Sequence, residues 1–313
     1  MNTNEIIELA RSYLDESSAD YASGSGDYSD TEILLGANKE NEHLFTIERG
    51  ANKDWFLREH VFDTKTTKFA YHLPIDCVNP RRVEMIDSGS ITGTFPFYVV
   101  NEGSATIVEL SPQGLNDRGY MYARANSDTL LTNAGYYLAD NKINFFDSTY
   151  LGSAYKCRLF YSPTAPELHR STAQAGGSDW IQFGLSTDPQ MLGKVMVLDN
   201  YYKGMLVEII SGTGAGQIKW VEKYVGSTKT ATVDSSWATS PDSTSIYCIV
   251  SPIIKDYQEL LALGSVIRLK GIKTEDDPSV VAQLYSTVKA RYELDVKQRG
   301  KHGAHRVRQT NWE

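Results

Sequence analysis

The sequence predicts an α+β fold in which terminal helices form an α-helical bundle with a large inserted antiparallel β region. At both ends of the chain, apolar residues recur at three- and four-residue spacing, which is typical of helices that bury one face. Between the ends, short β-branched and aromatic runs alternate with turn residues, which is typical of strands. Each terminal pair of helices is too short to bury its apolar stripe alone, so we expect the two pairs to pack together.

The N-terminal segment, residues 1–54, predicts two helices. Apolar residues recur over positions 6–14, and Asn2 with Glu5 matches a capping box at the start of this helix. A second capping box, S-x-x-E over positions 29–32, predicts the start of the next helix.

The middle of the chain predicts two β regions. The first covers residues 55–175 and the second covers residues 176–252, with the Gly176-Gly177-Ser178 triplet as the boundary between them. Both contain runs of β-branched and aromatic residues bounded by Gly, Pro, Asn, Asp and Ser.

A glycine-rich stretch in the second β region, SGTGAGQIKWVEKY over positions 211–224, raises the question of a phosphate-binding loop. The spacing matches neither a P-loop nor a dinucleotide fingerprint, and an alternating polar–apolar run follows in place of a helix. We therefore predict that Gly212, Gly214 and Gly216 supply positive-φ positions in a β-hairpin and bind no nucleotide.

Helical spacing returns in residues 253–296, which predict the C-terminal helices of the bundle. Asp256 and Glu259 match the cap of the first of these helices, and the second is predicted to begin near Ser279. The helical apolar spacing ends at Val296, so we predict that residues 297–313 form a basic extended tail.

This tail is the predicted partner-binding site. Residues 297–313 hold five Lys or Arg and one Glu, a charge of +4, so the overall charge of −8 leaves −12 for residues 1–296. Gly300 and Gly303 disfavour a continuing helix, and we predict that the tail orders only against an acidic groove of a partner. A solvated terminus and a contact with DNA are the alternatives. The predicted binding residues are Lys297, Arg299, Lys301, Arg306, Arg308 and Trp312.

No catalytic, cofactor or metal residue is predicted, and the chain is not expected to be an enzyme. The six His residues are scattered, and neither H-E-x-x-H nor G-x-S-x-G occurs. Asp147 and the Asp276-Asp277 pair fit capping or solvated roles better than catalysis. The Tyr136-Tyr137 and Tyr201-Tyr202 pairs are candidate faces for stacking on a sugar, although such pairs more often place one ring in the core.

Composition excludes further classes of protein. The 313 residues contain no apolar run long enough for a membrane span, and the first residues match no signal peptide. Cys77, Cys157 and Cys248 lie far apart in sequence, which fits buried thiols in a reducing compartment better than a disulfide framework.

Several short stretches occur together in an informative order. Asn38 or Asn41 occupies an asparagine position within the second predicted helix. The stretches are Leu9–Asp15 with Tyr28–Leu34, Tyr71–Pro74, Gly212–Gln217 through Val233–Trp237, Pro241–Tyr247, and Asp256–Gly264. In combination they resemble the head-to-tail adaptor (connector, or neck) proteins of tailed double-stranded DNA phages, in a long form with an inserted β region.

The resemblance implies a structural virion protein at the neck, made in the host cytoplasm. Its copies would form a ring, typically twelve-fold, that binds the portal protein and offers a docking face to tail or nozzle proteins. Genomic DNA would pass through the ring without sequence recognition, and an acidic wall suits such a conduit because it repels phosphates. The alternatives are a second neck or tail ring, a receptor- or glycan-binding tail β protein, and a phage hydrolase with a clustered acid pair.

Overall fold

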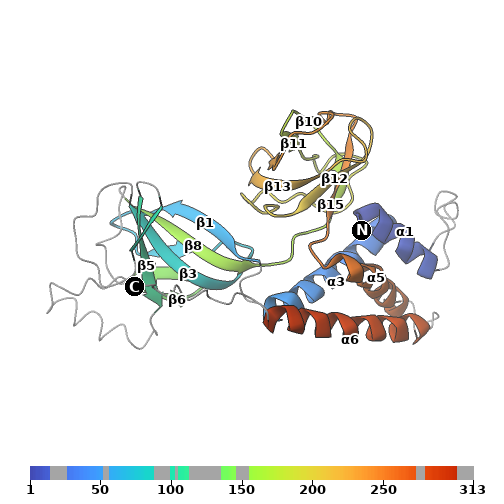
Figure 1. The fold of residues 1–313 in the computed structure, drawn as a ribbon, viewed down its shortest axis with the longest axis horizontal. Helices are drawn as coiled ribbons and strands as arrows, with labels where there is room; N and C mark the ends of the chain where they lie inside the picture. Colours follow the sequence, from blue (N-terminus) through green and yellow to red (C-terminus); the bar gives the residue numbers. More distant parts are fainter. Residues whose placement is uncertain are drawn as a thin grey trace, which may run out of the picture. The chain divides into compact units, whose positions relative to one another are not determined.

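The computed structural model describes residues 1–14, 27–51, 56–87, 99–102, 105–112, 135–145, 155–272 and 279–301 (Figure 1). The chain divides into two compact units. Unit 1 joins residues 1–52 with residues 165–313, and unit 2 consists of residues 53–164. Each unit is described by itself below.

The predicted fold class, α+β with a bundle of terminal helices and an inserted antiparallel β region, is wrong. The described residues are organised mainly by an eight-stranded and a seven-stranded sheet. The seven-stranded sheet belongs to unit 1 together with the helices, and the eight-stranded sheet contains a parallel pair, β5 with β6. The physical reason is that hydrogen bonds between residues far apart in sequence join the second β region to the helices. The spacing of apolar residues along the chain does not predict such bonds.

The helices of unit 1 begin where the sequence places local caps. Asn2 and Glu5 form the capping box of the first helix, and the Ser29 hydroxyl accepts from the Glu32 N–H at 3.2 Å. Asp256 is not a cap, because it lies in a 3₁₀ turn and the next α-helix begins at Glu259. The helices are α1 (Thr3–Tyr13), α3 (Asp30–Ala51), η2 (Lys255–Tyr257), α5 (Glu259–Ile272) and α6 (Ser279–Lys301).

Helix α5 contacts α1, α3 and α6, and a close backbone approach fixes its crossing with α3. A Cβ atom on Gly36 would lie 2.4 Å from the Ser265 hydroxyl and 3.0 Å from its Cα. The same hydroxyl donates to the Ile33 carbonyl at 2.7 Å. Glycine is therefore required at position 36 for the two helices to lie this close together.

Helix α6 continues to Lys301, so the prediction of an extended tail from residue 297 is wrong for residues 297–301. Tyr292 and Val296 on α6 are fully buried, and the Tyr292 hydroxyl donates to the Leu44 carbonyl of α3 at 3.0 Å. This anchorage outweighs the cost of about 1 kcal/mol for Gly300 within a helix.

The seven-stranded sheet of unit 1 is antiparallel, in the order β10-β11-β14-β13-β12-β15-β9. Its core is aromatic, and Phe183 stacks on Tyr247 with ring centroids 4.7 Å apart. Gly212, Gly214 and Gly216 have φ of +78°, +82° and +86° between β12 and β13, which confirms the predicted hairpin. The strands are β9 (Arg170–Thr172), β10 (Ala175–Gly176), β11 (Trp180–Gln182), β12 (Leu206–Ser211), β13 (Ile218–Val225), β14 (Thr230–Val233) and β15 (Ile246–Val250).

The eight-stranded sheet of unit 2 has the order β1-β8-β3-β5-β6-β7-β2, with β4 paired to β5. Its entry strand β1 and its exit strand β8 pair directly, with Arg58 opposite Tyr161. Asp76 closes this end of the sheet by an ion pair with Arg58 and by accepting from the Tyr161 hydroxyl at 2.9 Å. The strands are β1 (Arg58–Asp63), β2 (Ala70–His72), β3 (Cys77–Asp87), β4 (Val99–Glu102), β5 (Ala105–Pro112), β6 (Gly135–Ala139), β7 (Lys142–Phe145) and β8 (Tyr155–Pro163).

Candidate interaction groove

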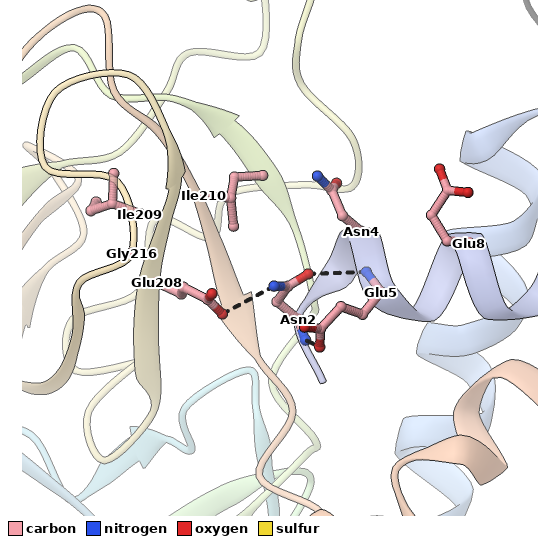
Figure 2. A pocket seen from close by; sticks show the side chains of 8 residues that line it. All are labelled: Asn2, Asn4, Glu5, Glu8, Glu208, Ile209, Ile210 and Gly216. Carbon is pink, nitrogen blue, oxygen red and sulfur yellow. Dashed lines mark hydrogen bonds between the residues drawn. The ribbon is translucent and has the colours of Figure 1, made fainter. Parts of the chain in front are cut away.

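A groove in unit 1 lies between the start of α1 and the β12–β13 hairpin (Figure 2). Its volume is about 340 Å³. Helix α1 and the hairpin line it with eight residues: Asn2, Asn4, Glu5, Glu8, Glu208, Ile209, Ile210 and Gly216.

Asn2 organises the groove because its side chain bonds to both walls. Its Oδ1 accepts from the Glu5 N–H at 3.0 Å, and its Nδ2 donates to Glu208 Oε2 at 3.1 Å, as Figure 2 shows. Glu5 Oε2 accepts from the Asn2 N–H at 2.9 Å, which completes the capping box. The residue that starts the helix therefore also fixes the position of a carboxylate on β12.

Further polar contacts hold α1 on the sheet. The fully buried Thr3 hydroxyl lies 3.5 Å from the His169 carbonyl oxygen and 3.4 Å from that of Ile249. The Arg170 guanidinium donates to Asn4 Oδ1 at 2.6 Å. The groove is thus a fixed surface of unit 1, with each wall bonded to the other.

The groove is acidic. Glu5, Glu8 and Glu208 line it, no Lys or Arg is among its lining residues, and a cation, the Met1 ammonium group, lies 3.9 Å from Glu5 Oε2. Burial lowers the pKa of the Met1 ammonium group, and the carboxylates of Glu5 and Glu208 oppose that shift. Acidic residues in the first turn are also favoured by the helix dipole of α1. The groove is therefore suited to cationic side chains, and its lining holds no Ser, Cys or His nucleophile.

An exposed apolar sheet face borders the groove. Leu206 and Glu208 on β12 lie opposite Trp220 and Ile218 on β13, so all four side chains lie on the same face of the sheet. Ile218 is 50% exposed and Trp220 is 52% exposed. Val221, the next residue along β13, points to the opposite face of the sheet and is buried. We name Leu206, Ile218 and Trp220 the apolar rim of the groove.

Two asparagines join α3 to the segment through which the chain enters the sheet of unit 1. Asn38 exchanges two bonds with the Leu168 backbone, at 3.0 Å and 2.7 Å. Asn41 donates to the Pro166 carbonyl at 2.9 Å and accepts from the Ser251 hydroxyl at 2.9 Å. Both asparagine positions raised by the family resemblance therefore have a structural role in unit 1.

Buried His169 packs within the aromatic core of unit 1. It is fully buried, and burial lowers its pKa to about 3, so its ring is neutral near pH 7. Its Nε2 lies 3.2 Å from the Tyr247 hydroxyl, and its ring packs against Phe183 and Tyr202. Within the part of the chain that the structure describes, no cluster of three or more His, Cys, Asp or Glu residues is arranged to hold a metal ion.

The predicted tail residues fall into two groups. Lys297, Arg299 and Lys301 lie in the last turns of α6, and Lys297 Nζ lies 3.9 Å from Glu293 Oε2. The other three, Arg306, Arg308 and Trp312, lie outside the described residues.

Sequence reasoning did not find the groove. Its signal was present in part, as the Asn2–Glu5 cap and the acidic net charge of residues 1–296. The contact between Asn2 and Glu208 joins residues 206 positions apart, which no local pattern predicts.

The Tyr201-Tyr202 pair offers no stacking face, and the Tyr136-Tyr137 pair places one ring in the core and leaves Tyr137 half-buried. Tyr136, Tyr201 and Tyr202 are all buried, and the hydroxyls of the latter two bond to backbone groups. Asp147, Asp276 and Asp277 lie outside the described residues. Cys77, Cys157 and Cys248 are free thiols, and burial raises the pKa of Cys77 and of Cys248 to about 12.

Neither a protein-family model nor a curated protein matches this chain. Within the described residues, no helix combines the length and the apolar character that crossing a bilayer requires.

Proposed function

We propose that the chain is a non-enzymatic structural protein of the neck of a tailed phage virion. In this role it forms a homo-oligomeric ring below the portal, extends the DNA channel and gives the tail its attachment face. The observation that carries the proposal is the fixed acidic groove with its apolar rim, which combines the charged and apolar features of a protein-binding surface.

The charge of the chain supports a place beside DNA. Residues 1–296 carry −12, and a negative wall repels phosphates and so allows a duplex to pass without binding. The hydrogen bonds of Asn38 and Asn41 support a mechanical role, because they couple the helices of unit 1 to its sheet through buried backbone groups.

Portal binding is assigned in this proposal to the C-terminal residues. A stop codon after Lys301 removes Arg306, Arg308 and Trp312 and leaves the last described turn of α6 intact. The truncated chain is expected to lose attachment to portal-bearing heads. Truncated protein that attaches as well as the full chain would show that these residues do not dock on the portal.

The proposal as a whole is tested by electron microscopy of the full chain, alone and mixed with portal-bearing, DNA-filled heads. A ring at the portal vertex is expected, together with retained DNA and tail attachment. Absence of the chain from the vertex in a mixture that contains excess protein would contradict it.

A glycan-binding role on the tail is the second candidate, and exposed Trp220 is the observation that favours it, since an exposed aromatic ring can stack on a sugar. Glycan-array binding that is lost on Trp220→Ala would support this role. No binding by the wild-type chain would exclude Trp220 as a sugar platform.

A further inference from the structure

We propose that the outer face of α6 in one copy of the chain binds the acidic groove and apolar rim of unit 1 in a second copy. This inference rests on the proposed function in one respect, since a ring requires a contact between copies, and it names the surfaces that make that contact.

Helix α6 carries two apolar stripes. The inner stripe packs against α3, where the Tyr285 hydroxyl donates to Glu40 Oε1 at 2.6 Å and the Tyr292 hydroxyl donates to the Leu44 carbonyl. Val280, Leu284 and Leu294 form the outer stripe and fall within an arc of about 80° on a helix of 3.6 residues per turn. The outer stripe is exposed, at 78% for Val280, 40% for Leu284 and 59% for Leu294.

The outer stripe is flanked by positive charge. Residues 289–301 hold five Lys or Arg and two acidic residues, a charge of +3. Arg291 lies on the arc between Leu284 and Leu294, and both Arg291 and Lys297 are exposed. The outer face of α6 therefore presents the apolar stripe with cations beside Leu294 in its C-terminal half.

The groove presents the complementary combination. Its rim residues Ile218 and Trp220 are exposed and apolar, and the adjoining wall carries Glu5, Glu8 and Glu208. Docking α6 here would bury leucine against tryptophan and would set Arg291 and Lys297 beside carboxylates. Tryptophan is a residue type that dominates binding energy at interface centres, and opposite charges around it fix the register.

The geometry of such a contact favours a ring over a simple dimer. The outer face of α6 and the groove are different surfaces of unit 1, so the contact is heterologous. A heterologous contact repeats from copy to copy and closes into a ring when the rotation permits.

The test uses two variants of the full chain, each with one surface damaged. The groove variant carries Glu8→Arg and Trp220→Ala, and the helix variant carries Arg291→Glu and Leu294→Ala. A control variant carries Leu35→Ala and Lys39→Glu on the exposed face of α3, which matches the chemistry of the changes on α6. Native mass spectrometry and light scattering measure the oligomeric state of each.

The wild-type chain and the control are expected to form the same oligomer. Each damaged variant alone is expected to self-associate at least about tenfold more weakly than the wild-type chain. A mixture of the two is expected to yield heterodimers, because the groove variant keeps an intact helix and the helix variant keeps an intact groove. Recovery in the mixture also shows that both variants are folded.

Three outcomes would overturn the inference: a wild-type chain that stays monomeric, damaged variants that assemble as well as wild type, or a mixture with no heterodimer. A ring that survives in the damaged variants refutes these surfaces and leaves the proposed function standing. Self-association through these surfaces in a chain that does not attach to portal-bearing heads refutes the proposed function instead.

Discussion

Both units bury paired ionisable groups, as Arg11 with Asp30 in unit 1 shows, but unit 1 also buries Glu48 and His169 outside any ion pair among the described residues. In unit 2, the buried Arg58 guanidinium pairs with the buried Asp76 carboxylate, which also accepts from Tyr161. In unit 1, Glu48 on α3 is buried with an Oε1 atom that has no hydrogen-bond partner. His169 of unit 1 is buried with a neutral tyrosine hydroxyl at its Nε2.

The difference appears in the pKa values. Burial raises the pKa of Glu48 to about 7, and the Tyr292 hydroxyl, the Ile254 backbone and the Arg299 charge only partly offset it. Burial lowers the pKa of His169 to about 3. In unit 2, burial raises the pKa of Cys77 to about 12 and moves that of Tyr161 further above its ordinary value, away from neutrality. Among the described residues, unit 1 should therefore respond to pH in the neutral range through Glu48, whereas the shifted groups of unit 2 titrate far above neutrality.

The largest effect is expected from a substitution that breaks the buried ion pair of unit 2. Asp76→Ala leaves the Arg58 charge buried without this carboxylate, and it should destabilise unit 2 by about 3–5 kcal/mol. Hydrogen exchange with mass spectrometry measures this loss in unit 2 peptides separately from unit 1 peptides. Lys156→Ala is the control, since its pair with Asp63 is exposed and 3.9 Å long, and it should change stability by less than about 0.5 kcal/mol. Equal effects of the two changes would remove the contrast between the units.

The second prediction sharpens the comparison through pH. Because the folded pKa of Glu48 lies above its ordinary value, folded unit 1 binds the proton more tightly than the unfolded chain. The stability contributed by the protonated carboxyl is therefore complete below about pH 4.5 and is lost as pH rises toward 7. The full loss is on the order of 3 kcal/mol for a shift of this size.

Glu48→Gln should flatten this part of the pH profile of unit 1 and stabilise it above pH 7. Unfolding in urea at a series of pH values, followed by hydrogen exchange of unit 1 peptides, measures both effects. Glu42→Gln, an exposed position on the same helix, is the control and should keep the parent's slope. Parallel profiles for the parent and Glu48→Gln would mean that Glu48 ionises normally.

The third prediction concerns the α3–α5 crossing of unit 1. Gly36→Ala places a Cβ 2.4 Å from the Ser265 hydroxyl, so the helices must separate or lose the bond from Ser265 to Ile33. The expected cost is about 1–3 kcal/mol in unit 1 and nothing in unit 2. Gly50→Ala on the same helix is the control, because its Cβ would meet no atom within 4 Å. A Gly36→Ala chain as stable as Gly50→Ala would show that the crossing adapts freely.

Local features of this fold were predictable from sequence, and distant ones were not. The Asn2–Glu5 cap and the positive-φ glycines of the β12–β13 hairpin depend on neighbours within a few residues, and both were predicted correctly. The pairing of Asn2 with Glu208 depends on how the second β region folds back onto α1, so neither the groove nor the composition of unit 1 was predicted. The end of α6 was missed because buried Val296 anchors the last turns, which outweighs the glycine that follows.

The smallest expected effect concerns the neutral partner of His169. The Tyr247 hydroxyl accepts from the Gly184 N–H at 3.0 Å and lies within hydrogen-bond distance of His169 Nε2, at 3.2 Å, where the imidazole tautomer decides which of the two donates. Tyr247→Phe removes both bonds while it keeps the stacked ring, and it should cost unit 1 about 1–2 kcal/mol at pH 7. Urea unfolding, followed by hydrogen exchange of unit 1 peptides, measures the loss. Tyr257→Phe is the control, because the Tyr257 hydroxyl bonds to Asp295 at a less buried position. This control should lower the free energy of unfolding by less than about 0.5 kcal/mol. If Tyr247→Phe costs no more than the control, the hydroxyl does not stabilise the neutral imidazole, and the buried histidine of unit 1 is held by ring packing alone.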